Sequence, residues 1–142
     1  MLEPKAVLER VFKEFLNPHN PTAYKEFYGD IVCHAPIGEL KGEAHRQFMV
    51  GLFSAFPDVR FNIEDMIAVD DKVVTRWSSI GTHKGMFMGA APTGKTVTNF
   101  GTTIDRVVNG KIVEEWPHWD TLGFMQQLGV VPTAKVKEHV AA

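Results

Sequence analysis

A two-residue turn between two long strand-like segments constrains the fold more than any other feature of the sequence. Asn109-Gly110 separates residues 96–108 from residues 111–119, and both turn residues readily adopt the positive φ values that a tight hairpin requires. The turn therefore predicts a long antiparallel hairpin. A chain of 142 residues is long enough for one domain with a substantial core around this hairpin.

The register of this hairpin decides which of its side chains share a face. With a two-residue turn and regular pairing, Thr103 lies opposite Trp116, and the same face carries His118 and Asp120. A bulge at the proline between Trp116 and His118 would change this alternation. We expect residues 115–120 to line a deep apolar pocket, with Trp116, His118 and Asp120 facing inward.

The remaining sequence contains helical patterns first and strand patterns afterwards, which is typical of an α+β domain. The expected helices are 7–16, 24–28, 43–56 and 122–128, and the expected strands are 31–34, 59–69, 73–82, 96–108 and 111–119. We predict one domain over residues 1–142, with helices on one face of a curved antiparallel sheet. Its core covers about residues 5–130, and the tail from residue 131 is expected to be loosely attached.

Composition and charge exclude several classes of protein. The formal net charge is −2 and no basic run occurs, which argues against a nucleic-acid partner. No apolar stretch approaches the roughly 20 residues of a membrane helix, and the chain opens directly into a helical pattern without a signal peptide. The single Cys33 cannot form an internal disulfide, so we expect a cytoplasmic protein in which Cys33 is a small buried group.

Neither the phosphate-loop pattern nor the histidines of this sequence have the context that a binding site requires. Residues 89–96 match the phosphate-binding loop pattern, but the residues that follow form a strand pattern rather than the helix such a loop must open. The histidines His34, His45, His83 and His118 show no metal-ligand spacing. We therefore expect neither a nucleotide nor a metal site.

An acid, an imidazole and an indole at one end of a sheet indicate a site for chemistry. A carboxyl beside Trp116 would be poorly solvated, and its raised pKa would suit a general acid or base. Asp120 also precedes a short helix, and the local sequence alone favours a helix cap. His83 can equally be an exposed loop histidine, and His34 a hydrogen-bonded core histidine; both are also candidates for the site with His118.

Taken together, several motifs resemble the SnoaL-like polyketide cyclases, a family that shares its fold with nuclear transport factor 2 and ketosteroid isomerase. Each motif is weak alone, but their order and spacing are specific. They are Phe56-Pro57-Asp58, Ile63-Glu64-Asp65-Met66-Ile67, Gly81-Thr82-His83-Lys84-Gly85, Pro92-Thr93-Gly94-Lys95, the run from Asp105 to Ile112, Trp119-Asp120, and Gln126-Gln127-Leu128-Gly129.

The resemblance implies a cone-shaped α+β barrel around an apolar cavity, without metal or organic cofactor. It implies an intramolecular aldol condensation, in which Asp120 stands at the position of the family's acid/base aspartate. A histidine of well-developed cyclases is replaced here by Thr103, so His118 or His83 would supply the second polar group. The resemblance also implies homodimers or homotetramers, which would cover the exposed face of an open sheet.

Our leading hypothesis is therefore a cyclase, or a related lyase or isomerase, that acts on an apolar and aromatic or polycyclic carbonyl compound. Asp120, His118 and His83 are its catalytic candidates. The candidate substrate-binding residues are His34, Phe53, Phe56, Trp77, Phe100, Thr103 and Trp116. Two alternatives are a binding protein for a hydrophobic metabolite, and epoxide opening by water activated at Asp65 and Arg76.

Overall fold

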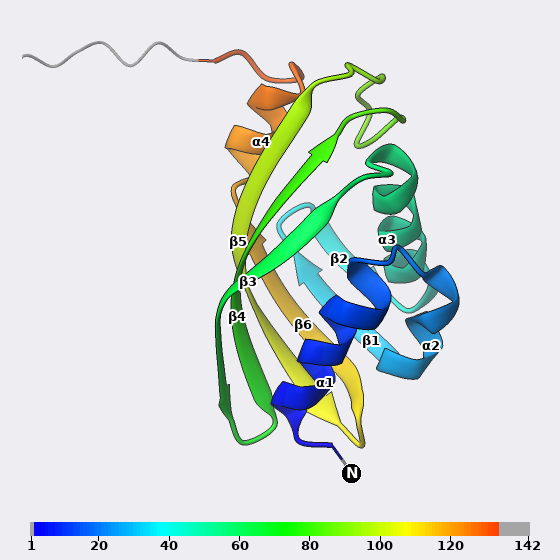
Figure 1. Cartoon of the computed structure of the whole chain (residues 1–142), viewed down its shortest axis with the longest axis vertical. Helices are drawn as coiled ribbons and strands as arrows, with labels where there is room; N and C mark the ends of the chain where they lie inside the picture. The colour runs from blue at the N-terminus through cyan, green and yellow to red at the C-terminus, as the bar shows by residue number, and fades with distance from the viewer. Residues whose placement is uncertain (1, 134–142) are drawn as a thin grey trace, which may run out of the picture.

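A curved, open sheet with helices against its concave face forms the body of the molecule (Figure 1). The computed structural model describes residues 2–133, so most of the predicted tail lies outside the described residues. The α+β prediction is confirmed. The sheet does not close into a barrel, because its edge strands pair with no further strand among the described residues.

The helices and strands follow the order expected from the sequence, with one additional strand. The elements are α1 (Pro4–Arg10), a π-helical stretch (Val11–Leu16), a short 3₁₀ helix (Pro21–Ala23), α2 (Tyr24–Phe27), β1 (Tyr28–Ala35), β2 (Gly38–Lys41), α3 (Glu43–Ala55), β3 (Arg60–Val69), β4 (Lys72–Thr82), β5 (Thr96–Val108), β6 (Lys111–Trp119) and α4 (Thr121–Gln127). The residues after the phosphate-loop match form β5, as predicted, and no helix opens there.

The strands lie in the order β2-β1-β6-β5-β4-β3. All neighbouring pairs are antiparallel except β1 and β6, which run parallel. Figure 1 shows α1, α2 and α3 on one side of the sheet and α4 beside one end of β5. None of the helices in the described part of the chain has the length and apolar character needed to cross a membrane.

The hairpin of β5 and β6 contains a bulge close to its turn. Val107 pairs with Ile112 as predicted, but Arg106 pairs with Glu114, which leaves Val113 without a partner in the ladder. Because side chains alternate along a strand, this extra residue moves every later side chain of β6 to the other face. The predicted register beyond the bulge is therefore wrong: Thr103 lies opposite Pro117 rather than Trp116.

Candidate functional site

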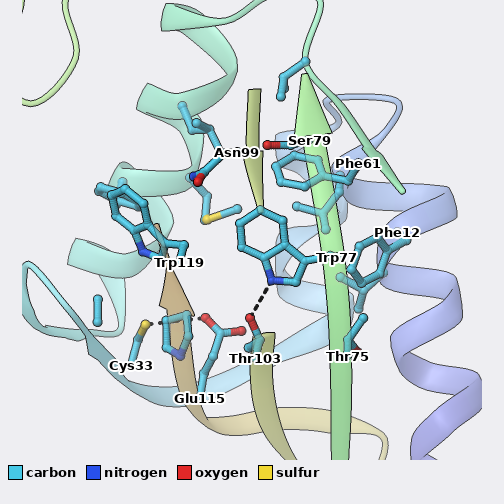
Figure 2. Close-up of a pocket in the computed structure, with 18 of the residues that line it drawn as sticks. Phe12, Cys33, Phe61, Thr75, Trp77, Ser79, Asn99, Thr103, Glu115 and Trp119 are labelled. Atoms are coloured by element: carbon cyan, nitrogen blue, oxygen red, sulfur yellow. Dashed lines mark hydrogen bonds between the residues drawn. The ribbon is translucent and has the colours of Figure 1, made fainter. Parts of the chain in front are cut away.

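A deep pocket lies between the concave face of the sheet and the helices, and its volume is about 160 Å³. Its walls are mainly aromatic. Rings from both the helices and the sheet line it: Phe12, Phe48, Phe56, Phe61, Trp77, Phe87, Trp119 and Phe124. Figure 2 shows the indoles of Trp77 and Trp119 on opposite sides of this space. The arrangement suits an apolar ligand that is largely removed from water.

Glycine at position 101 allows the two indoles to approach the sheet closely. Gly101 pairs with Trp77 on β4 and with Trp119 on β6. A Cβ atom there would lie 2.7 Å from Cζ2 of Trp77 and 2.5 Å from the carbonyl oxygen of His118. Any side chain at this position would therefore displace a wall of the pocket.

A few polar groups interrupt the apolar walls. The Trp77 indole Nε1 donates a hydrogen bond of 3.0 Å to Oγ1 of Thr103, so the donor of this indole is already engaged. Ser79 and Asn99 also line the pocket, toward the end away from Thr103 in Figure 2. The side walls thus offer a ligand isolated polar contacts.

Two carboxyl groups form the polar floor of the pocket. Asp105 on β5 pairs directly with Glu115 on β6, and both line the pocket. Asp105 is 3% exposed, and the Glu115 side chain is 13% exposed. Two acids at this depth cannot both be ionised at low cost, because their charges repel and neither is well solvated.

A histidine and a cysteine complete this floor. His45 on α3 places Nε2 3.2 Å from Oε1 of Glu115, and the Cys33 thiol on β1 donates to the same oxygen at 3.4 Å. On its other side, His45 Nδ1 lies 2.7 Å from the Tyr24 hydroxyl. Three strands and two helices therefore bring the floor together.

The two floor acids have opposite pKa shifts. Burial, together with the negative charge of Glu115, raises the pKa of Asp105 well above its ordinary value. Burial also works against the ionised form of Glu115, but hydrogen bonds with His45 and Asp105 keep the pKa of Glu115 below its ordinary value. Between these two pKa values the pair carries one proton, held by Asp105. Environments that separate two pKa values in this way are typical of an acid and a base that work together.

The sequence matches the model of the family described as SnoaL-like polyketide cyclase over residues 6–128. The chain belongs to this family. The resemblance predicted from its motifs is confirmed, and membership supports a cyclase-like or isomerase-like role. No curated protein matches the sequence significantly.

Solved structures share the SnoaL-like fold with this chain. AclR from Streptomyces galilaeus, provisionally described as a hydroxylase, is 29% identical; the match covers 92% of this chain and 83% of AclR, with a TM-score of 0.81. A provisional polyketide cyclase from Acidithiobacillus ferrooxidans is 28% identical over 92% of this chain and 97% of its own, with a TM-score of 0.76. IdmH from Streptomyces antibioticus, also provisionally a polyketide cyclase, is 26% identical over 90% and 99%, with a TM-score of 0.76.

Within this SnoaL-like fold, three of the predicted site residues line the deep pocket: Phe56, Trp77 and Thr103. Segment 115–120 contributes alternate residues to it, but through Glu115, Pro117 and Trp119. The expectation that Trp116, His118 and Asp120 face inward is wrong, because the bulge at Val113 reverses the alternation.

The displaced residues lie on or beside the outer face of the sheet. His118 and Phe100 border a shallow outer depression, and Phe100 is 63% exposed. The Trp116 ring stacks on His34 at 5.4 Å, and neither lines the pocket. Arg76 donates to Asp65 at 2.7 Å with both side chains more than half exposed, so this pair is remote from the pocket.

Asp120 also borders the outer depression, at the start of α4. Its Oδ1 accepts a hydrogen bond of 3.0 Å from the backbone N–H of Gly123. This is the N-cap arrangement that the local sequence favours.

Two further predicted residues are buried outside the pocket lining. His83 is fully buried, stacks on Phe56 at 5.3 Å, and places Nδ1 3.0 Å from Oγ1 of Thr93. It is therefore not an exposed loop histidine. Phe53 packs against Phe15 in the core behind the pocket wall.

Sequence reasoning missed the four residues of the floor. Glu115 belongs to the segment expected to line the pocket, but the predicted register turns it outward and away from Asp105. His45 and Cys33 are distant from both in sequence, so no local spacing connects the four. An acidic residue at an inward-facing position of a strand is unusual and would indicate a site. The inward-facing positions of β6 can be assigned only once the bulge at Val113 is known.

Proposed function

We propose that this protein is a cyclase-like enzyme that transfers protons to and from an apolar carbonyl compound by means of its own side chains. The observation that carries the proposal is the pair Asp105 and Glu115. The pKa of Asp105 is raised and that of Glu115 is lowered, so that over a range of pH one acid is protonated and the other is ionised in an apolar pocket. Aldol-type chemistry requires both a base for carbon and an acid for oxygen.

In the proposed reaction, ionised Glu115 takes a proton from the carbon α to a carbonyl group. The C–H electron pair becomes the enolate, whose carbon attacks a second carbonyl carbon of the same molecule. The alkoxide formed in that step takes a proton from Asp105, and a proton passes from Glu115 to Asp105 to restore the pair. Exclusion of water by the aromatic walls strengthens each of these electrostatic interactions.

The size of the pocket supports a compact substrate. A cavity of about 150 Å³ takes up a benzene ring, and the pocket here measures about 160 Å³. We therefore propose a substrate with one aromatic ring beside its reacting carbonyl groups. Polycyclic compounds would require the walls to move apart.

Proton exchange on a one-ring model compound tests this function without knowledge of the natural substrate. The probe is methyl benzoylacetate in D₂O, and NMR follows loss of its α-proton signal above the buffer rate. Glu115→Gln should lower the exchange rate by at least about 100-fold, which is typical of a lost general base. Glu114→Gln, on the outer face, should retain the wild-type rate.

Asp120→Asn provides the second comparison, because asparagine caps helices as well as aspartate does. The proposal expects this variant to retain exchange. Loss of exchange in Asp120→Asn together with full exchange in Glu115→Gln would instead favour Asp120 as the acid/base residue. Binding of the probe without any exchange by the wild-type protein would favour the alternative of a binding protein. Asp105→Asn repeats the test if Glu115→Gln does not fold, as judged by circular dichroism.

We also propose that a second copy of the chain covers the outer face of the sheet. Large apolar side chains there remain exposed: Ile67, Ile80 and Phe100. Phe100→Asp should shift the protein toward monomer in sedimentation experiments, because a charge would enter the interface. The proposed environment is the cytoplasm, which suits the free thiol of Cys33.

A further inference from the structure

The floor of the pocket has a second chemical capability that the proposed proton transfer does not use. Cys33, His45 and Glu115 come from β1, α3 and β6, and their Sγ, Nε2 and carboxylate oxygen atoms all lie within 4.8 Å of one another. Both Cys33 and His45 are at least 98% buried. Thiolate, imidazole and carboxylate are the three ligand types that proteins use for zinc.

Two of the three distances between these atoms match the edges of a tetrahedral metal site, and the third is within 4.8 Å. With metal bonds of about 2.3 Å to sulfur and about 2.0–2.1 Å to nitrogen and oxygen, tetrahedral angles separate sulfur from oxygen by about 3.5 Å and nitrogen from oxygen by about 3.3 Å. The observed separations from Oε1 of Glu115 are 3.4 Å to Sγ of Cys33 and 3.2 Å to Nε2 of His45. A cation could therefore sit between the three atoms with small side-chain movements.

Two features of the residues around these three atoms support a metal site. A histidine ligand normally donates its second N–H to a fixed partner, and Nδ1 of His45 lies 2.7 Å from the Tyr24 hydroxyl. Independently, Oδ1 of Asp105 is buried beside Glu115 and has no hydrogen-bond partner among the described residues. An unpartnered buried oxygen is costly, and this one lines the same pocket floor.

We propose that Cys33, His45 and Glu115 form a three-ligand binding site for a borderline-soft divalent cation such as Zn²⁺. Binding replaces the thiol proton of Cys33, which passes to solvent, so affinity should increase with pH. A cation also compensates the negative charge of Glu115. Hard cations such as Mg²⁺ and Ca²⁺ should bind poorly, because they prefer sites made entirely of oxygen.

This site does not depend on the proposed function, since it is defined by binding alone. The two are nevertheless linked, because a cation on Glu115 would occupy the oxygen proposed to accept the α-proton. If the function is correct, Zn²⁺ should therefore inhibit α-proton exchange. If the function is wrong, the metal site is unaffected.

Titration of the full, tag-free chain with Co²⁺ tests the site, because thiolate coordination gives cobalt a charge-transfer band in the near ultraviolet. We expect saturation at one equivalent and displacement of Co²⁺ by Zn²⁺ but not by Mg²⁺. Cys33→Ser should abolish the charge-transfer band, and His45→Leu should weaken binding by at least about tenfold.

The matched control uses the histidine–glutamate pair on the outer face. His34→Leu should leave the cobalt spectrum unchanged, because His34 pairs with Glu114 away from the pocket. A wild-type protein without the band, or a band retained by Cys33→Ser but lost in His34→Leu, would overturn the proposal. If Cys33→Ser fails to fold, the wild-type protein can be alkylated with and without Zn²⁺ instead. Zn²⁺ should protect the Cys33 thiol from alkylation, and absence of protection would count against the site.

Discussion

Glu114 and Glu115 are successive residues of β6, yet they illustrate two different uses of the same side chain. Glu114 faces outward and lies 2.9 Å from Nε2 of His34. Glu115 faces inward and lies 3.2 Å from Nε2 of His45. The His34 side chain is 35% exposed, whereas that of His45 is 2% exposed. Each glutamate thus has a histidine, but only one of the two pairs is removed from water.

The neighbours on β5 complete the contrast. Glu114 pairs with Arg106, whose Nε lies 3.3 Å from Oε1 of Glu114, so the outer acid contacts both an arginine and a histidine. Glu115 pairs with Asp105, a second acid. The outer group is therefore a solvated ion-pair cluster, and such clusters contribute little to the free energy of unfolding. The inner group places two carboxyl groups that share one proton in an apolar site. Such shifted pKa values are typical of acid/base chemistry.

The largest effect is expected from removal of the bulge that separates the two faces. Deletion of Val113 would restore regular pairing and turn Glu115, Pro117 and Trp119 outward. We expect the deletion variant to be unfolded at room temperature by circular dichroism, while Val113→Thr remains folded. A deletion variant with the wild-type melting temperature would show that the bulge does not set the inner face.

Loss of the inner histidine should have the next largest effect. His45→Leu leaves the Glu115 charge buried beside Asp105 without its hydrogen-bonded histidine partner, and breaking a buried pair in this way costs about 3 kcal/mol. His34→Leu, its outer counterpart, should change stability little because solvent compensates Glu114. Urea denaturation of the two variants checks the difference. Equal losses would contradict the distinction between the two faces.

Asp105 on the inner face and Glu114 on the outer face should also respond to pH with opposite signs. The pKa of Asp105 is raised by burial and by the charge of Glu115. The folded state thus binds more protons than the unfolded state above pH of about 4, and stability falls as pH rises toward the folded-state pKa. Asp105→Asn should remove this fall.

The outer acid should behave in the opposite way. Hydrogen bonds from His34 and Arg106 lower the pKa of Glu114, so its contribution is complete above pH of about 4.3 and is lost as pH falls through the folded-state pKa. Glu114→Gln should remove only this acid-side loss. Denaturation curves from about pH 3 to about pH 8, a range that begins roughly one unit below both reference values and extends well above them, check both variants. The same pH profile for both would contradict the assignment.

The smallest effect is expected for the two tryptophans on opposite faces. Trp77→Phe removes the indole donor to Thr103, and loss of such a hydrogen bond costs about 1 kcal/mol. Trp116→Phe retains a ring against His34 and should cost less. Chemical denaturation distinguishes the two, and a larger loss for Trp116→Phe would count against the buried role of Trp77.

The fold was largely predictable, because it follows from patterns that lie within single segments. The Asn109-Gly110 turn, the switch from helical to alternating spacing, and the order of the family motifs each required only local sequence. The parallel contact between β1 and β6, and the short β2, were not expected. They depend on how distant segments meet, which no local pattern reports.

The candidate site was predictable only in part, and a single residue explains much of the difference. Phe56, Trp77 and Thr103 were expected in the pocket and line it. The inward members of β6 were wrong because Val113 has no feature that marks a bulge, although one extra residue reverses all side chains after it. His45 was noted only for its lack of metal spacing, since its partner Glu115 lies 70 residues away.

Carboxyl ¹³C NMR is the most direct test of the claim that the inner face holds a protonated acid beside an ionised one. Spectra of the labelled protein recorded across the acidic and neutral range, with Asp105→Asn and Glu115→Gln for assignment, report the state of each group. The structure predicts that Asp105 titrates well above its ordinary range while Glu115 is already ionised in mild acid. Titration of both groups near their ordinary values of about 4 would contradict it.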